Sequence, residues 1–302
     1  MIELIDIKKH FENVKAVDGI SFTAQQGEIF GLIGPNGAGK STTIRMIMNI
    51  IAPDSGRILF NGKMIREEDK SLIGYLPEER GLYKKAKVSE LLYYFASLKK
   101  RYRQDYKQNI DRWLQKFGLM DWKYKKVTEL SRGMSQKVQF IASVAHDPQI
   151  LFFDEPFSGL DPVSADLLLE SILQLGKAGK TILFSTHIME HAEKICNKIF
   201  LINRGREVIS GTIGDVKDHY GRKSIIIEFS GDGEFMEKLP QVEHLIRYPR
   251  FVEIRLKEGS SPDELLKTIV NRISIRRFEI VAPSLHNIFV SLVNDREEVK
   301  NG

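Results

Sequence analysis

The sequence of 302 residues contains one cysteine, Cys196, and so cannot form an internal disulfide. This excludes the class of small secreted domains held together by disulfides, and it is typical of a chain that works in a reducing cytoplasm. Hydrophobic residues make up 42% of the chain, which excludes intrinsic disorder over most of its length. The length is sufficient for one large domain followed by a small one.

Long hydrophobic runs are also absent, since no stretch approaches the roughly 18 apolar residues of a membrane-spanning helix. The N-terminal segment lacks the charged and apolar regions of a signal peptide. From these two absences we expect a chain that does not enter the bilayer. If it serves a membrane process, it is expected to do so as a peripheral protein on the inner face of the cell membrane.

Acidic residues are scarce between Arg80 and Lys126, where 14 Lys and Arg stand against 4 Asp and Glu, although the whole chain has a net charge of only +5. One interpretation is a solvated helical face. The other is a surface for anionic lipid headgroups or for nucleic acid. The charge count alone leaves both interpretations open.

Short apolar stretches alternate with helical patterns through the first two thirds of the chain. Residues 28–33 are expected to form a strand, followed by a glycine-rich turn and an apolar helix over 42–51. Two further strands are expected in ILFFDEP (150–156) and TILFSTH (181–187), separated by a helix over 162–176. This alternation predicts an α/β fold with a mainly parallel sheet that is covered on both faces.

The stretch over about 79–148 has a helical pattern instead. Leu91, Leu92, Phe95 and Leu98 are spaced there as one buried stripe. We interpret the stretch as a helical insertion into the α/β core. Core and insertion together are predicted to form one domain over residues 1–214.

The character of the sequence changes after this domain, and a second domain is predicted over 222–302. Strands are expected at 224–229, 242–248, 251–256 and 273–280, with helices at 233–239, 261–273 and 284–293. The order β-α-β-β-α-β is typical of a small ferredoxin-like α+β domain. The tail, 295–302, is expected to be frayed.

GPNGAGKS, residues 34–41, matches the phosphate-loop pattern G-x-x-x-x-G-K-[ST]. Glycines let backbone N–H groups turn toward phosphate oxygens, and the following helix directs its positive end at the same oxygens. Lys40 is expected to reach the β and γ phosphates, and the Ser41 hydroxyl to bind Mg²⁺. The predicted binding residues are Gly34, Pro35, Asn36, Gly37, Ala38, Gly39, Lys40, Ser41 and Thr42. The alternative, a glycine-rich turn with an incidental Lys-Ser pair, is disfavoured by its position between strand and helix.

Asp154 and Glu155 stand at the end of the strand expected in ILFFDEP. Ligands of parallel sheets bind at the carboxyl ends of the strands. Adjacent side chains of an extended backbone point to opposite sides, so one carboxylate can hold Mg²⁺ while the other orients water. We assign Asp154 to the metal and Glu155 to the attacking water as general base. A purely structural pair is the alternative that the phosphate loop upstream disfavours.

Four motifs in this order resemble the ATP-binding subunits of ABC transporters: GPNGAGKS, LSRGMSQK (130–137), LFFDEPFSGLD (151–161) and a lone His187 after a strand. The resemblance covers residues 1–210. It implies a P-loop NTPase core of the ABC type, ATP and Mg²⁺ as cofactors, and attack of water on the γ-phosphorus as the reaction.

The resemblance also implies roles for single residues. Phe11 lies where the family places an aromatic ring against adenine, and stacking on a ring tolerates any base. His187 corresponds to the switch histidine that contacts the γ-phosphate. Ser131 and Gly133 belong to the signature, which in the family faces ATP held by the partner subunit. Asp161 ends the loop by which each subunit touches the other's site. Taken alone, Phe11 and His187 would be interpreted as structural residues.

Two positions depart from the family pattern. Glu78 stands where the family usually has a glutamine that contacts Mg²⁺ and the lytic water, so a carboxylate there either joins the metal's ligands or is repelled by the γ-phosphate. In the signature, usually LSGGQ, the chain has Arg132 and Met134. Both departures resemble a group of bacterial ABC proteins with a C-terminal extension. We expect a helix from Met134, whose positive end points at the signature.

The resemblance favours the ATP-hydrolysing motor subunit of a transporter, with export as the favoured direction. Its expected partners are a separate membrane permease subunit and a second copy of the chain or a related ATP-binding subunit. The alternative is a soluble ABC ATPase acting on nucleic acid or ribosomes. One ATP domain, no long coiled coil and no zinc-type cysteine cluster disfavour that alternative, and no nucleic acid is expected. A regulator that binds ATP without hydrolysis would lack Glu155 or His187. The second domain is expected either to hold two copies together or to bind a small regulator.

Overall fold

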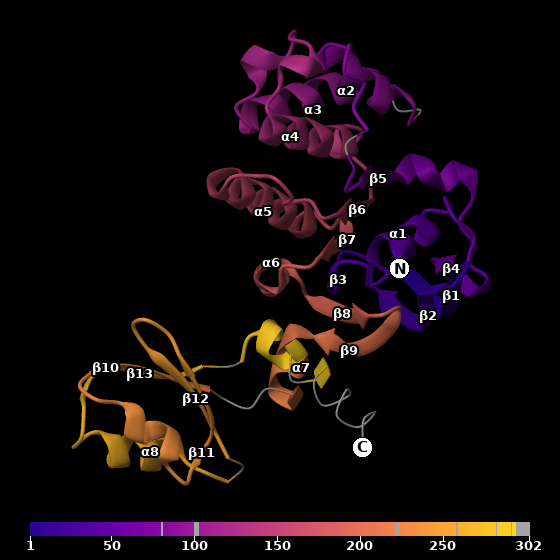
Figure 1. Cartoon of the computed structure of the whole chain (residues 1–302). Helices are drawn as coiled ribbons and strands as arrows, with labels where there is room; N and C mark the ends of the chain where they lie inside the picture. The colour runs from indigo at the N-terminus through magenta and orange to yellow at the C-terminus, as the bar shows by residue number, and fades with distance from the viewer. Residues whose placement is uncertain are drawn as a thin grey trace. The chain divides into compact units, whose positions relative to one another are not determined.

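A computed structural model of the chain describes residues 1–79, 81–99, 103–220, 224–257, 259–281, 283–290 and 292–293. Two compact units divide the chain, Met1–Ile213 and Gly214–Gly302. Each unit has its own core and is described by itself. Figure 1 shows the elements of both units along the chain.

A six-stranded sheet forms the centre of the first unit, with the strand order β5-β6-β7-β3-β8-β9. All neighbouring strands are parallel except the last two, β8 and β9. The strands are β3 (Ile29–Ile33), β5 (Ile73–Leu76), β6 (Ile150–Asp154), β7 (Thr181–Thr186), β8 (Lys198–Asn203) and β9 (Arg206–Thr212). Every residue of β3 and β7 is buried, as expected of strands covered on both faces. The prediction of a mainly parallel sheet is confirmed.

A second, antiparallel sheet has the order β2-β1-β4 and consists of β1 (Ile2–Phe11), β2 (Val14–Ala24) and β4 (Ser55–Phe60). Its apolar side chains join one continuous core with residues of β3, β6, β7 and β8, including Phe30, Phe152 and Phe200. This separate sheet was not predicted from the sequence, because pairing between distant strands leaves no periodic signal. The result is a layer of antiparallel strands packed against the parallel sheet.

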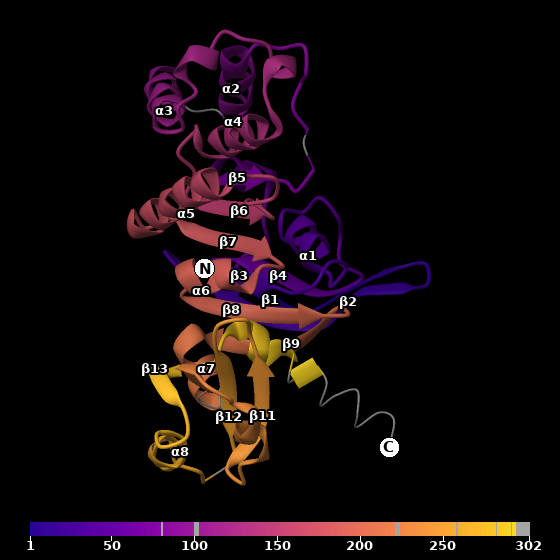
Figure 2. The same cartoon turned by 60° about the vertical axis from the view of Figure 1, so that its left-hand side comes forward.

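Three helices flank the parallel sheet. They are α1 (Lys40–Ile47), α5 (Pro162–Lys177) and α6 (Met189–Ile195). In Figure 2 the arrowheads of β6, β7 and β8 point toward the edge where α1 lies. The expected helices over 42–51 and 162–176 are present with shifted bounds, and α1 begins at Lys40 because Gly39, in left-handed backbone geometry, ends the loop before it.

The predicted insertion contains α2 (Val88–Ser97), α3 (Arg103–Lys116) and α4 (Arg132–Val144), with the short 3₁₀ turns η2 (Met120–Trp122) and η3 (Val127–Glu129) between α3 and α4. Another 3₁₀ turn, η1 (Glu67–Leu72), precedes β5. A run of aromatic contacts through Trp113, Phe117, Phe140 and Phe153 joins α3 and α4 to β6. The predicted buried stripe is wrong at its end, because Leu98 follows the last residue of α2 and is 56% exposed.

The second unit is a four-stranded antiparallel sheet with the order β11-β12-β10-β13. Its elements are β10 (Ser224–Ser230), η4 (Glu234–Lys238), β11 (Val242–Arg247), β12 (Val252–Leu256), α8 (Pro262–Ile269) and β13 (Ser274–Val281). The helix α7 (Ile213–Tyr220) precedes them, and residues 285–290 and 292–293 are helical. The expected α-helix over 233–239 is a short 3₁₀ turn instead. The tail 295–302 lies outside the described residues.

Candidate active site

The loop between β3 and α1 depends on glycine. Gly37 and Gly39 have φ angles of 77° and 111°, in the region that favours glycine. A Cβ at Gly39 would also lie 2.4 Å from the carbonyl oxygen of Ala16, a distance that no side chain tolerates. The tight path around these glycines turns the loop back on itself before α1 begins. The backbone N–H groups at the start of a helix have no partner within the helix, and here they are left to face the inside of the loop.

Lys40 is the first residue of α1 and is buried. Its Nζ atom donates to the carbonyl oxygens of Gly34 at 2.8 Å and Pro35 at 3.2 Å. The same atom forms an ion pair with Glu155 Oε1 at 3.3 Å. A buried ammonium group needs such partners, because an unpaired charge is costly away from water. Lys40 therefore connects the glycine-rich loop to the end of β6.

Asp154 ends β6 and is fully buried. Its Oδ1 atom accepts hydrogen bonds from Ser41 Oγ at 3.1 Å and from Ser185 Oγ. Burial raises the pKa of this carboxyl, and the neighbouring Glu155 adds to the effect. The second oxygen, Oδ2, is buried without a hydrogen-bond partner among the described residues. An unsatisfied buried carboxylate oxygen beside a serine hydroxyl offers oxygen donors of the kind that a hard divalent cation binds.

Glu155 follows β6 with a φ of 49°, so the chain leaves the extended conformation at this residue. Its backbone N–H donates to Ser185 Oγ at 3.2 Å, and its Oε2 atom lies 3.0 Å from His187 Nδ1. The two adjacent carboxylates thus have different partners. Asp154 contacts Ser41 and Ser185, whereas Glu155 contacts Lys40 and His187.

Ser185 was not predicted from the sequence, although its hydroxyl contacts both the carboxylate of Asp154 and the backbone N–H of Glu155. It lies in β7 directly opposite Asp154 in the strand register, which explains the contact. The available signal was a polar residue inside an otherwise apolar strand, two positions before His187. A serine in a buried strand is a weak signal by itself, because its hydroxyl is often satisfied by a nearby carbonyl.

A cavity of about 190 Å³ lies between these elements, and it is lined by Val14, Ala16, Asn36, Gly37, Gly39, Lys40, Ser41, Thr42, Glu78 and Glu155. Most of the predicted phosphate-loop residues therefore border one cavity. Gly34, Pro35 and Ala38 do not. The first two contribute carbonyl oxygens to Lys40, and Ala38 is buried. Val14 and Ala16, on β2, were not predicted from the sequence.

Phe11 stands beside this cavity. It ends β1, is 43% exposed, and pairs in the strand register with Val14, which lines the cavity. Lys9 Nζ lies 5.4 Å from the centroid of its ring. A partly exposed aromatic ring can offer a face on which a planar base stacks.

The signature residues lie elsewhere. Ser131 is the N-cap of α4, where its hydroxyl accepts a hydrogen bond from Met134 N at 3.2 Å. Asp161 caps α5 in the same way through Ser164 N at 2.9 Å. The Ser164 hydroxyl, which donates to Asp161 Oδ2 at 2.6 Å, and this backbone contact lower the pKa of the Asp161 carboxyl. A Cβ at Gly133 would lie 3.9 Å from the carbonyl oxygen of Gly159, so the signature adjoins the 158–161 loop. Neither Ser131, Gly133 nor Asp161 lines the cavity.

The helix that carries the signature begins two residues earlier than expected, at Arg132 instead of Met134. The Arg132 side chain is exposed. A cation in the first turn of a helix is disfavoured by the helix dipole, unless an anion lies nearby.

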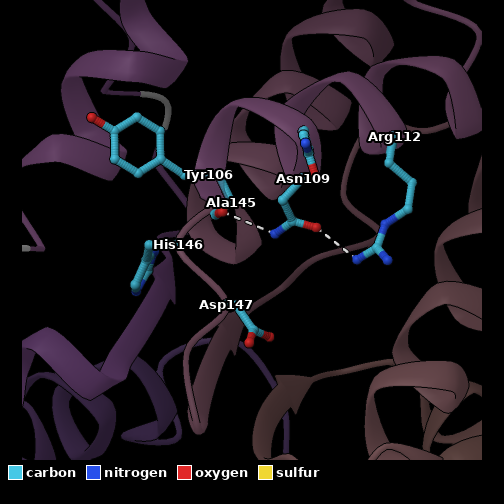
Figure 3. A pocket seen from close by; sticks show the side chains of 7 residues that line it. Tyr106, Asn109, Arg112, Ala145, His146 and Asp147 are labelled. Atoms are coloured by element: carbon cyan, nitrogen blue, oxygen red, sulfur yellow. Dashed lines mark hydrogen bonds between the residues drawn. The ribbon is translucent and has the colours of Figure 1, made fainter. Parts of the chain in front are cut away.

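A larger cavity, of about 610 Å³, is lined by residues of α3 and of the turn before β6 (Figure 3). There Asn109 donates to the carbonyl oxygens of Val144 and Ala145, and Arg112 donates to Asn109. Asp147 lines this cavity before the amino end of β6, whereas Asp154 ends the strand. The cavity therefore borders the opposite edge of the sheet from the carboxylates.

Comparisons with known proteins match this geometry. The family model for ABC transporters matches residues 17–158, which include the loop, both carboxylates and the signature. Over 293 residues, or 97% of the chain, it is 38% identical to the ABC transporter ATP-binding protein YhaQ of Bacillus subtilis, of which it covers 98%. The chain belongs to the ABC transporter ATP-binding proteins. It is an ATP-binding subunit that hydrolyses ATP for transport.

Further matches cover the first and the second unit of this ATP-binding subunit. A solved structure of an ABC transporter ATP-binding subunit matches with a TM-score of 0.68 and 31% identity, over 73% of this chain and 93% of the other. The model for the C-terminal domain of DrrA1-3-like ATP-binding proteins matches residues 211–293. Among the described residues, no helix of the subunit is long and apolar enough to cross a membrane. The resemblance seen in the sequence is thereby confirmed at the level of the family.

Proposed function

We propose that this subunit closes head to tail with a second ATP-binding subunit around ATP and Mg²⁺, and that this cycle drives export through a separate membrane subunit. The observation that carries the proposal is the convergence of Lys40, Asp154, Glu155 and His187 at the carboxyl ends of β6 and β7. The partner is a second copy or a related ATP-binding subunit. The signature supports a composite site, because its residues do not border the cavity of their own chain.

Each residue of the cluster has a distinct task. Lys40 and the backbone N–H groups of residues 36–42 hold the phosphates, with Phe11 against the base. Ser41 and Asp154 hold Mg²⁺, with Glu78 within the same cavity as a further oxygen donor. When bound, the metal neutralises charge on the phosphate oxygens.

Glu155 accepts the proton of the attacking water, and His187 orients its carboxylate through Oε2. Lys40 holds the other oxygen, so that the carboxylate is positioned from two sides. Ser131, Gly133 and Asp161 supply the contacts to the nucleotide of the partner subunit. Hydrolysis removes that shared contact, and the two subunits can then separate.

Relatives support export and a membrane partner. The Nod factor export ATP-binding protein I of Rhizobium sp. is 32% identical over 98% of both chains. The linearmycin resistance ATP-binding protein LnrL of Bacillus subtilis is 31% identical over 97% of this chain. A structure titled as part of the ABC transporter complex cbiONQ matches with 26% identity over 71% of this chain and a TM-score of 0.62. By this proposal the subunit works at the inner face of the cell membrane.

The domain assignment belongs to the same proposal. Residues 1–214 form the ATP-binding domain, with the helical insertion over about 79–148, and residues 222–302 form the accessory domain. Its strand order supports a ferredoxin-like module in which the first helix is shortened to η4. This module holds two subunits together while their ATP-binding domains separate, or it binds a small regulator.

Glu155→Gln tests the proposal. We expect ATP binding to remain, turnover to fall at least about 100-fold, and a stable ATP-dependent dimer to accumulate. Binding is measured with a fluorescent ATP analogue, turnover by phosphate release, and association by light scattering. Glu170→Gln, on the exposed part of α5, is the matched control and should leave all three unchanged. Retained multiple turnover in Glu155→Gln would remove Glu155 from its role.

A further inference from the structure

Two segments of the insertion that are distant in sequence lie side by side and bring their lysines together. Val88 N donates to Lys125 O at 3.0 Å, and Val127 N donates to Ala86 O at 3.0 Å. Lys87 and Lys126 form the antiparallel bridge between the segments. The pairing gathers the basic surface, which consists of the exposed residues Lys84, Lys85, Lys87, Lys125 and Lys126. Five of the lysines in this basic stretch are therefore gathered at one place on the surface.

Within the described part of the chain, most of these cations have no acidic partner. Lys84, Lys85, Lys125 and Lys126 form no ion pair with any carboxylate that the structure describes, and Lys87 lies 3.8 Å from Glu90 with both side chains mostly exposed. Two nearby carboxylates already accept hydrogen bonds from backbone N–H groups. Glu90 accepts from Lys87 N at 3.1 Å, and Glu129 accepts from Lys126 N at 2.8 Å.

Exposed aromatic rings flank the basic surface. Tyr83 is 59% exposed and directly precedes Lys84, and Tyr124 is 70% exposed and directly precedes Lys125. The Tyr83 ring packs against the rings of Tyr94 and Phe95, at centroid distances of 5.9 and 6.2 Å. Rings with an apolar body and a polar tip, next to flexible lysines, suit the headgroup layer of a bilayer, where both parts find partners.

We propose that the basic surface binds the anionic headgroups of a membrane directly. Its cations are all lysines, which act as hydrated point charges, while the bidentate recognition of nucleic acid favours arginine. None of these residues lines the nucleotide cavity. The inference rests on the proposed function only in that a membrane transporter subunit works close to lipid. The attraction itself needs neither ATP nor a membrane subunit.

Vesicle sedimentation with the purified full chain tests the proposal. The chain should bind vesicles of phosphatidylcholine mixed with phosphatidylserine, should not bind vesicles of phosphatidylcholine alone, and should dissociate as salt is raised. The Lys85→Gln, Lys125→Gln, Lys126→Gln triple variant should lose about fivefold in binding for each lysine, on the order of 100-fold together. Its ATPase activity should be unchanged.

The Lys63→Gln, Lys177→Gln, Lys238→Gln triple variant is the matched control. It removes the same charge from exposed lysines outside the basic surface and should bind mixed vesicles like the wild type. Equal losses in both triple variants would overturn the proposal, because binding would then depend on net charge alone. Tighter binding to a single-stranded RNA than to mixed vesicles at the same salt would also overturn it.

Glu155→Gln separates this inference from the proposed function. That variant should bind mixed vesicles like the wild type even though it has lost turnover. If it retains turnover and vesicle binding still depends on the basic surface, the proposed role of Glu155 fails and the membrane surface stands. If turnover is lost as expected and neither lysine triple variant changes vesicle binding, the membrane surface fails alone.

Discussion

The carboxylate of Glu155 lies between a histidine and a lysine: His187 Nδ1 is 3.0 Å from its Oε2 atom, and Lys40 Nζ is 3.3 Å from its Oε1 atom. The three residues come from the ends of β6 and β7 and the start of α1. The positive φ of Glu155 turns its side chain out of the strand toward both partners. A general base held in this way keeps one orientation while its protonation state changes.

His187→Ala removes the contact to Oε2. We expect turnover to fall by about 100-fold or more, because the carboxylate loses its orientation, while ATP affinity changes little. Phosphate release and equilibrium binding of a fluorescent ATP analogue measure the two quantities. Glu190→Ala, at an exposed position three residues on, is the control. Normal turnover in His187→Ala would mean that Lys40 alone orients Glu155.

Ser185→Ala removes the hydroxyl that donates to Asp154 and accepts from the backbone of Glu155. The free energy of unfolding should fall by about 1–3 kcal/mol, because the buried carboxylate of Asp154 loses one of its two hydrogen-bond donors, while Glu155 N keeps the carbonyl oxygen of Ser185 as an acceptor. Urea denaturation measures this. In the control Ser143→Ala, the lost hydroxyl only donates to Phe140 O within its own helix, so the decrease should stay below about 1 kcal/mol. Equal effects in both variants would show that the site does not depend on Ser185.

Substitutions of Ser131 separate its capping role from its role at the partner's nucleotide. Ser131→Ala should reduce the free energy of unfolding by about 1 kcal/mol, because Met134 N loses its acceptor. Ser131→Asp keeps a good N-cap and should remain as stable as the wild type. If the residue faces a phosphate of the partner's ATP, the added negative charge should abolish ATP-dependent dimerisation. A stable Ser131→Asp chain that dimerises normally would leave only the capping role.

His191 predicts a pH dependence of stability. Its ring centroid lies 4.3 Å from that of Phe157, and burial lowers the pKa of this histidine, with a further contribution from Lys194. The unfolded chain then binds more protons than the folded chain as pH falls below the ordinary value of about 6.5, so stability decreases in that range. His187 also repels a proton on His191, whereas Glu190 and Glu155 attract it.

In His191→Phe the ring contact to Phe157 remains while the titrating group is removed. The loss of unfolding free energy between about pH 7.5 and pH 5.5 should therefore be smaller in the variant than in the wild type. Urea denaturation at both pH values gives the difference. An identical pH dependence in both proteins would assign it to other groups.

The local parts of the fold were predictable because their signals are local. Gly37, Gly39 and Lys40 require a phosphate loop at one place, and an apolar run places Asp154 at a strand end. The strands of the second unit follow from period-two patterns in the same way. Helix ends were less certain, as the exposed Leu98 and the early start of α4 show, since packing decides where the last turn ends.

Contacts between distant segments were not predictable in this way. Ser185 meets Asp154 through the strand register, and Val14 reaches the cavity because β2 belongs to a second sheet. The paired lysine segments are separated by α2 and α3 in the chain. No periodic pattern in the sequence encodes contacts of this kind, because they depend on how whole helices and strands pack against one another.

The sequence by itself determined which chemistry this protein carries: a phosphate loop, two carboxylates after a strand, a histidine after another strand, and a signature before a helix. Each motif can be recognised locally, because the residue types and their spacing within a few positions are enough to identify it. Only the tertiary structure decided which groups touch. It joined Glu155 to Lys40 and His187, gave Asp154 its serine partners, and kept Ser131 outside the cavity of its own chain. The physical reason is that burial and hydrogen bonding act across the strand register and between packed elements, while sequence patterns report one element at a time.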